Sequence, residues 1–259
     1  MRSWALVAML LPVMALAPDA SKPLTLPVKG TALSIVMLRA EPGATGAVAP
    51  WLGRTEVPFE LLDAFVYEKA DAAPSGTDAV ARPSKPYISM DRGFGHAGFP
   101  AISVNIDTAQ AFCAWLSKAT GRAVRLPRVS ELRATCAAGA SGPLDERAWH
   151  AGNSKGTTHR VGSAKPDARG FFDLQGNAAE WAIGDDGKPV VWGGSFMDVA
   201  KDLACDRVRQ PSDDWNASDP QMPPSRWWLA DGPFVGFRVA VDPLPEERPS
   251  TNELKEKAP

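Results

Sequence analysis

The stretch that decides the fold is Gly170-Phe171-Phe172-Asp173-Leu174-Gln175-Gly176-Asn177-Ala178-Ala179-Glu180-Trp181. Its two carboxylates, Asp173 and Glu180, lie on either side of Gly176 and Ala178. Carboxylates and exposed carbonyls in a glycine-bearing loop are the hard oxygen ligands that Ca²⁺ prefers. The alternative is that Glu180 and Asn177 hydrogen-bond backbone groups of a tight turn, as buried polar side chains must. Both interpretations give the loop a structural role.

Three further blocks flank this stretch along the chain. They are Ala109-Gln110-Ala111-Phe112-Cys113-Ala114-Trp115-Leu116 leading to Arg125-Leu126-Pro127, then Gly193-Gly194-Ser195-Phe196, and finally Val235-Gly236-Phe237-Arg238-Val239-Ala240. Each block is weak evidence by itself. The four blocks in this order form a specific pattern.

Together the blocks resemble the formylglycine-generating enzyme (sulfatase-modifying factor) domain. The resemblance covers residues 27–242 and implies an α+β fold, a loop-rich elaboration of the C-type lectin fold with few short helices. It also implies a structural calcium site, in which the side chains of Asp173 and Glu180 and the carbonyls of Gly176 and Ala178 are the ligands.

The segment after the Gly-Gly-Ser turn departs from the family pattern. The enzymes of this family carry two cysteines there, and the two thiolates bind copper(I), a metal that soft sulfur ligands select. In this chain those two positions hold Asp198 and Leu203, and Cys205 is shifted past the second position. A carboxylate and a leucine cannot hold copper(I). We therefore expect no copper and no formylglycine-generating activity.

The three cysteines favour one disulfide and one free thiol. If the chain is exported, it meets an oxidising compartment in which a pair of cysteines should bridge. Cys136 and Cys205 are the favoured pair, because Cys113 lies between Phe112 and Trp115 on the apolar face of an expected helix. The resemblance implies the same pair. Pairings that involve Cys113 stay open from the sequence alone.

Composition limits the class of protein. A chain of 259 residues with 44% hydrophobic residues is long enough for one large globular domain. A net charge of −2 and scattered basic residues leave no electrostatic footprint for nucleic acid. With 24 prolines, 22 glycines and nine tryptophans against two tyrosines, we expect a loop-rich domain in which indoles fill the core.

The first twenty residues are typical of a secretory signal peptide. Arg2 is followed by an apolar run over residues 4–16, and Ala20 suits cleavage better than Ala17, which Pro18 follows. This predicts a periplasmic or secreted protein. A membrane association would arise only if the segment stays uncleaved, because the run is short and Pro12 interrupts it.

Periodicity and turn residues predict the elements of the first half. Residues 21–28 read as a leader, residues 32–39 and 51–57 as strands, and residues 71–86 as a surface loop. Pro58 suits the first turn of a short helix that carries Leu61, Leu62, Phe65 and Val66.

Two more helices follow, and the chain ends in a polar tail. Asn105 or Asp107 can cap a helix that closes at Gly121. A second helix over residues 130–137 has Ser130 as its expected cap. Residues 243–259 are rich in Pro, Glu and Lys, which predicts a disordered tail.

The histidines do not read as a metal site. The same fold resembles that of iron-dependent sulfoxide synthases, but those enzymes use histidines and a carboxylate from an additional helical domain. His96, His150 and His159 share no helical spacing, so no iron triad can be assigned. We expect all three in loops at a solvated surface.

A tryptophan-rich region suggests a ligand groove. Large rigid indole faces beside charged groups can hold a peptide or a sugar, although the same residues can equally pack as core. The expected groove residues are Trp192, Ser195, Asp198, Trp215, Arg226, Trp227 and Trp228.

Three functions follow from these features. The favoured hypothesis is an exported, catalytically inactive family member that binds a peptide, protein or glycan. The alternatives are a divergent enzyme that uses Asp198 for acid-base chemistry, and a structural envelope protein whose groove its own side chains fill.

Overall fold

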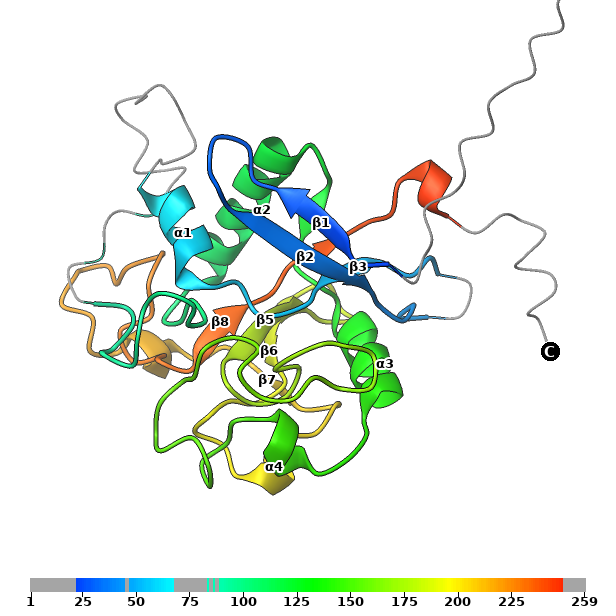
Figure 1. The fold of residues 1–259 in the computed structure, drawn as a ribbon. Helices are drawn as coiled ribbons and strands as arrows, with labels where there is room; N and C mark the ends of the chain where they lie inside the picture. Colours follow the sequence, from blue (N-terminus) through cyan, green and yellow to red (C-terminus); the bar gives the residue numbers. More distant parts are fainter. Residues whose placement is uncertain (1–21, 45–46, 68–82, 84–85, 87–88, 249–259) are drawn as a thin grey trace, which may run out of the picture.

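The computed structural model describes residues 22–44, 47–67, 83, 86 and 89–248. Two β-sheets form its centre (Figure 1). The first has the order β1-β2-β3-β9-β4 and is antiparallel, with strands Leu24–Pro27, Ser34–Arg39, Trp51–Gly53, Ala240–Val241 and Val124–Arg125. The second has the order β7-β6-β5-β8, with strands Val208–Arg209, Pro189–Trp192, Ala179–Ile183 and Val235–Phe237.

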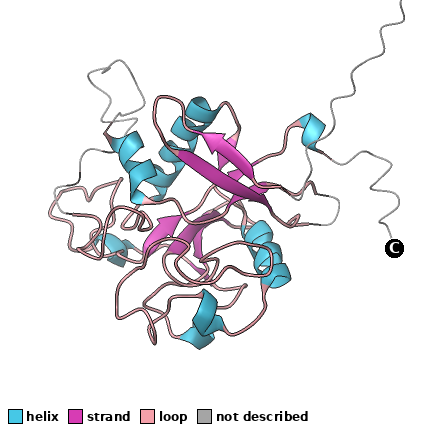
Figure 2. Cartoon of the chain, viewed as in Figure 1, coloured by secondary structure: helices cyan, strands magenta, loops and turns pink. Residues whose placement is uncertain are grey.

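Short helices and long loops complete the fold. The α-helices are α1 (Phe59–Val66), α2 (Ile106–Thr120), α3 (Val129–Gly139) and α4 (Leu144–Arg147), and three short 3₁₀ helices are η1 (Ala200–Asp202), η2 (Asp213–Asn216) and η3 (Pro245–Glu247). Loops dominate the half of the molecule around β5, β6 and α4 (Figure 2). The predicted α+β, loop-rich class is confirmed.

Aromatic side chains form the main core. Phe112 of α2 contacts Phe65 of α1 edge-on at 5.9 Å and Phe237 of β8 edge-on at 5.2 Å between ring centroids. Trp115 lies within 6 Å of both Phe65 and Phe112. A second cluster, with Trp192, Phe171 and Leu132 at its centre, lies under α3. Indoles therefore fill both clusters, as the composition predicts.

Helix α2 begins and ends where the sequence predicts. Asn105 caps it by accepting a 2.7 Å hydrogen bond from the Ile106 N–H, and Gly121 closes it with a φ of 70°. The buried face carries Ala109, Phe112 and Leu116. The start of α1 after Pro58 is also confirmed.

Helix α3 begins one residue earlier than expected, and Ser130 does not cap it. The Arg128 N–H donates a 2.9 Å hydrogen bond to the carboxylate of Glu131. Glu131 satisfies this amide from inside the helix, so no hydroxyl cap is needed.

Both ends of the domain extend beyond their predicted limits. Residues 24–27 are not a leader but the strand β1, which pairs with β2. Residues 243–248 are not disordered, because Glu247 accepts hydrogen bonds from Arg122 at 2.7 Å and from the Trp51 indole at 3.1 Å. The predicted signal peptide, most of the 71–86 loop and residues 249–259 lie outside the described residues. Within the described ranges, no helix is long and apolar enough to cross a membrane.

Candidate functional site

The Gly-Gly-Ser turn follows strand β6 and is held by Asp198. Gly193 and Gly194 have φ values of 93° and 73°, which glycine adopts without strain. The Asp198 Oδ2 atom accepts hydrogen bonds from the Ser195 N–H at 2.8 Å and from the Ser195 hydroxyl at 2.9 Å. Asp198 therefore stabilises the turn through two hydrogen bonds from Ser195.

The other oxygen of Asp198 is also engaged. Arg209 of β7 donates a 2.7 Å hydrogen bond to Asp198 Oδ1, and its guanidinium lies over the Phe234 ring at 5.0 Å. An aspartate that is paired in this way is an anchor for the turn. Nothing in this arrangement supports the acid-base role for Asp198.

Leu203 fills the space beside the turn. Its side chain is buried, and a Cβ atom added to Gly194 would lie 2.4 Å from Leu203 Cδ2. Gly194 is therefore required both for its φ and for this close approach. The two positions that the resemblance assigns to copper-binding cysteines hold an ion-paired carboxylate, Asp198, and a buried aliphatic side chain, Leu203, in this chain.

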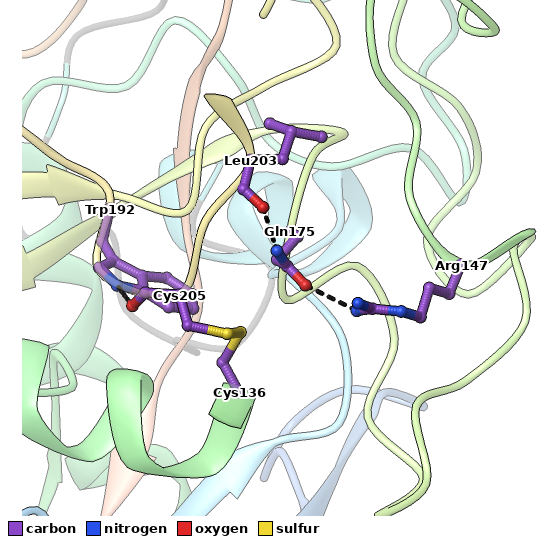
Figure 3. The surroundings of a disulfide bond; sticks show 6 residues. All are labelled: Cys136, Arg147, Gln175, Trp192, Leu203 and Cys205. Atoms are coloured by element: carbon purple, nitrogen blue, oxygen red, sulfur yellow. Dashed lines mark hydrogen bonds between the residues drawn. A yellow bond between two sulfur atoms is a disulfide. The ribbon is translucent and has the colours of Figure 1, made fainter. Parts of the chain in front are cut away.

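The surroundings of Leu203 are fixed by a disulfide and a polar relay (Figure 3). The Leu203 carbonyl accepts a hydrogen bond from Gln175, which in turn accepts one from Arg147 at 2.6 Å. Two residues further on, Cys205 is joined to Cys136 of α3, as the sequence predicts. Cys113 is free and buried, and burial raises its pKa to about 12. It is an inert thiol.

The tryptophans of the expected groove do not form one exposed surface. Trp192, Trp215, Trp227 and Trp228 are all buried, Trp192 in one cluster and the other three in the main core. Ser195 is buried too, whereas Arg226 is exposed and ion-paired with Asp107 at 2.9 Å. The groove prediction therefore needs correction, because the indoles cover apolar neighbours such as Phe234, which contacts Trp215 at 5.4 Å.

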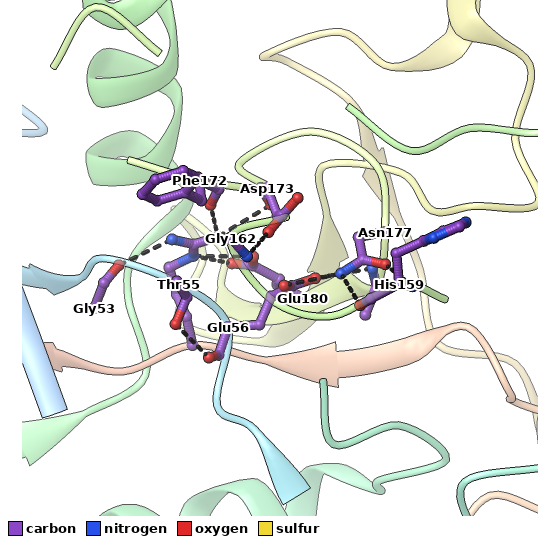
Figure 4. A network of polar contacts seen from close by, with 11 residues as sticks. Gly53, Thr55, Glu56, His159, Gly162, Phe172, Asp173, Asn177 and Glu180 are labelled. Carbon is purple, nitrogen blue, oxygen red and sulfur yellow. Dashed lines mark hydrogen bonds and ion pairs between the residues drawn. The ribbon is translucent and has the colours of Figure 1, made fainter. Parts of the chain in front are cut away.

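A network of buried charges includes Asp173 and Glu180 of the stretch that decides the fold (Figure 4). Arg238, between β8 and β9, is fully buried and donates to both oxygens of Glu180, at distances from 2.6 to 2.9 Å. It also donates to the carbonyls of Gly53, Phe172 and Asp173. One guanidinium thus ties the loop of residues 172–173 to both sheets.

Two more buried carboxylates belong to this network. Glu56 accepts hydrogen bonds from Ala178 at 3.0 Å and Asn177 at 3.1 Å, while Asp173 accepts one from Gly162 at 2.7 Å. Burial raises the pKa of Glu56 well above its usual range, and the nearby carboxylates of Asp173 and Glu180 add to this effect. Burial raises the pKa of Asp173 to about 6. Three acids therefore share one buried arginine.

In this structure, the side chains of Glu180 and Asp173, both predicted calcium ligands, contact other groups of the protein. Glu180 uses both of its oxygens on Arg238, so the guanidinium already supplies its positive partner. Of the carboxylate oxygens of Asp173 and Glu180, only Asp173 Oδ1 is buried without a hydrogen-bond partner. Across the described part of the chain, no group of three or more His, Cys, Asp or Glu side chains is arranged to hold a metal ion. Calcium binding through Asp173, Gly176, Ala178 and Glu180 stays a prediction.

Replacing Asp173 by asparagine tests the charge state of this network. The folded-state pKa of Asp173 lies above its unfolded value, so stability is lost as the pH rises from about 4 to about 6. Asparagine carries no charge and tolerates the φ of 53° at this position. We expect Asp173→Asn to be more stable than the wild type at pH 8 by about 1–3 kcal/mol, and the gap to close near pH 4.

The measurement is urea unfolding at several pH values with and without EDTA. The exposed Asp206 provides the matched control, because Asp206→Asn should leave the pH dependence unchanged. A loss of stability in Asp173→Asn that EDTA reproduces in the wild type would contradict the expected result and show that the carboxylate binds a metal ion.

The histidines hold loops together. His96 lies between Asp63 at 2.8 Å and Asp91 at 3.1 Å. His150 contacts Asp145 at 2.7 Å and is buried, which corrects the expectation that all three histidines lie at the surface. His159 stacks on Trp149 with ring centroids 3.7 Å apart.

Sequence reasoning missed the two residues that organise the buried network, Glu56 and Arg238. A signal was present for each. Arg238 is a charged residue within an apolar strand block, and Glu56 lies within the expected strand of residues 51–57. A charge at a core position is rare unless it is paired, so each predicts a buried partner.

Comparisons with known proteins agree with this architecture. Solved structures with the same fold include Treponema denticola variable protein 1, with 20% identity, a TM-score of 0.58, and coverage of 85% of this chain and 99% of that protein. PvdO from Pseudomonas aeruginosa has 22% identity, a TM-score of 0.59, and coverage of 86% and 99%. No curated protein sequence matches significantly. The model of the sulfatase-modifying factor enzyme 1-like domain matches residues 45–243, and the chain therefore belongs to this family, also named for the formylglycine-generating enzyme.

Proposed function

We propose that this protein is an exported family member without formylglycine-generating activity that binds a peptide, protein or glycan. The loss of activity is inferred from the residues at the two positions where the enzymes of the family carry their copper-binding cysteines. Asp198 is ion-paired with Arg209, and Leu203 is packed against Gly194. Neither side chain offers copper(I) a sulfur ligand.

Export is supported by the disulfide between Cys136 and Cys205, since such bonds persist in oxidising compartments. The predicted signal peptide points the same way. N-terminal sequencing of the protein from fractionated cells tests this part, and a mature chain that begins after Ala20 is the expected result.

The surface of the same loop supports binding. Met197 and Val199 flank Asp198 and expose 56% and 47% of their area to solvent. Interaction sites on protein surfaces are commonly built from exposed apolar side chains that lie close together. This pair gives the proposed ligand an apolar contact next to the Asp198–Arg209 ion pair.

Copper titration tests the absence of the catalytic metal. The wild-type protein is incubated with copper(I) and a chromophoric chelator, then with a cysteine peptide in the presence of oxygen. We expect no copper retained and no formylglycine in the peptide by mass spectrometry. One copper per chain, or conversion of the peptide, would overturn the proposal.

Peptide and glycan arrays test the binding role. The double variant Met197→Lys, Val199→Lys should lose binding, whereas Met222→Lys should keep it, because Met222 is 92% exposed but lies in a different loop. If both variants bind the ligand equally well, the ligand binds somewhere other than at Met197 and Val199. No binding by the wild type would favour the structural envelope protein, the second candidate, which the filled space around Leu203 and the buried tryptophans support.

A further inference from the structure

A cavity of about 360 Å³ lies between strand β2, the connection from β3 to α1, and the loop of residues 161–172. Its wall includes none of the residues of the Gly-Gly-Ser turn. The volume falls at the small end of the range for ligand pockets. The cavity is therefore large enough for a small molecule and separate from the surface considered above.

The wall of this cavity combines polar and apolar groups in similar proportion. Its apolar side chains include Ile35, Val57, Leu61, Val161, Phe172 and Val239. Ser34 and Thr55 add hydroxyl groups. The Thr55 hydroxyl donates to the Glu56 carbonyl at 2.9 Å, so its oxygen remains able to accept a hydrogen bond. Such a wall suits an amphiphilic ligand, whose apolar body can lie against the apolar side chains.

Arg54 supplies the positive charge of the cavity. Its guanidinium lies over the Phe172 ring at 4.8 Å, and its Nε atom is 3.4 Å from the Gly170 carbonyl oxygen. Among the described residues, no carboxylate lies within ion-pair distance of Arg54. Stacking on a ring orients a guanidinium, and its two terminal nitrogens match the two oxygens of a carboxylate.

The one acidic residue in the wall does not compete for Arg54. The carboxylate of Glu56 is buried and accepts its hydrogen bonds from Ala178 and Asn177, within the network that contains Arg238. The charge that the cavity presents to a ligand is therefore the guanidinium of Arg54. An anionic head group complements it.

We propose that this cavity binds a small carboxylic acid with an apolar body, whose carboxylate pairs with Arg54. The apolar body lies against Val57, Leu61 and Val161, and Thr55 offers a polar contact. The site is independent of the proposed binding surface at Met197 and Val199, so either one can fail without the other.

Calorimetric titration of the whole mature protein with octanoate tests this site. Octanamide has the same chain without the charge and serves as the ligand control. Arg54→Gln removes the guanidinium. Arg160→Gln is the matched protein control, because Arg160 also stacks on a phenylalanine, Phe99, but bonds the Ala97 carbonyl and does not line the cavity.

We expect saturable binding of octanoate to the wild type and to Arg160→Gln, and affinity lower by roughly tenfold in Arg54→Gln and for octanamide. Val161→Trp, which fills the cavity and keeps Arg54, should abolish binding. Circular dichroism confirms that each variant is folded. The proposal is overturned if octanoate does not bind the wild type, or if octanoate and octanamide bind it equally.

Discussion

Replacing Arg238 by methionine is expected to lower the free energy of unfolding by about 3–5 kcal/mol, because it leaves a buried carboxylate without its partner. Glu180 would lose every hydrogen bond from Arg238, and Gly53, Phe172 and Asp173 would lose a donor for their carbonyls. Urea unfolding at pH 7 measures the change. The loss is a large part of the total stability of an ordinary domain.

Two companion variants keep this prediction informative if Arg238→Met does not fold. Arg238→Lys keeps the charge but loses the planar fork, so a smaller loss is expected. Arg226→Met is the matched control, since Arg226 forms an exposed ion pair with Asp107 and should cost about 1 kcal/mol or less. A loss below about 1 kcal/mol for Arg238→Met would show that the buried acids do not depend on this arginine.

The disulfide is expected to have the second largest effect. Cys136 and Cys205 are 69 residues apart in sequence, and a crosslink over a loop of that length restricts the unfolded chain by about 4 kcal/mol. The double variant Cys136→Ala, Cys205→Ala should be destabilised by about this amount. Urea unfolding with and without dithiothreitol is the measurement.

The response to the reductant distinguishes the contribution of the crosslink to stability from the contribution of side-chain packing at the two cysteines. Dithiothreitol should lower the stability of the wild type and of Cys113→Ala by the same amount, because Cys113 is not part of the bond. It should leave the double variant unchanged. If the double variant also responds to dithiothreitol, the reductant acts elsewhere and the crosslink does not explain the difference.

The features predicted correctly depend on residues close together in sequence or on the resemblance. Asn105 and Gly121 set the ends of α2 by local hydrogen bonding and backbone conformation, so the sequence contains both signals. The pairing of Cys136 with Cys205 followed from the apolar helical position of Cys113 and from the family pattern.

The features predicted wrongly depend on contacts between distant segments. An indole that faces a ligand and an indole that faces the core have the same local sequence. Trp215 is buried because Phe234 and Trp181 meet it from other parts of the chain. The tail prediction failed for the same reason, since Arg122 of a distant segment holds Glu247.

The last strands of the chain complete both sheets. β8 pairs with β5 in one sheet, and β9 lies between β3 and β4 in the other. A chain that stops before residue 235 would leave β3, β4 and β5 each with an unpaired edge, and exposed edges invite association with other chains. Neither sheet can therefore be completed during folding until residues 235–241 are available, and fragments that lack these residues should aggregate rather than persist as smaller folded proteins.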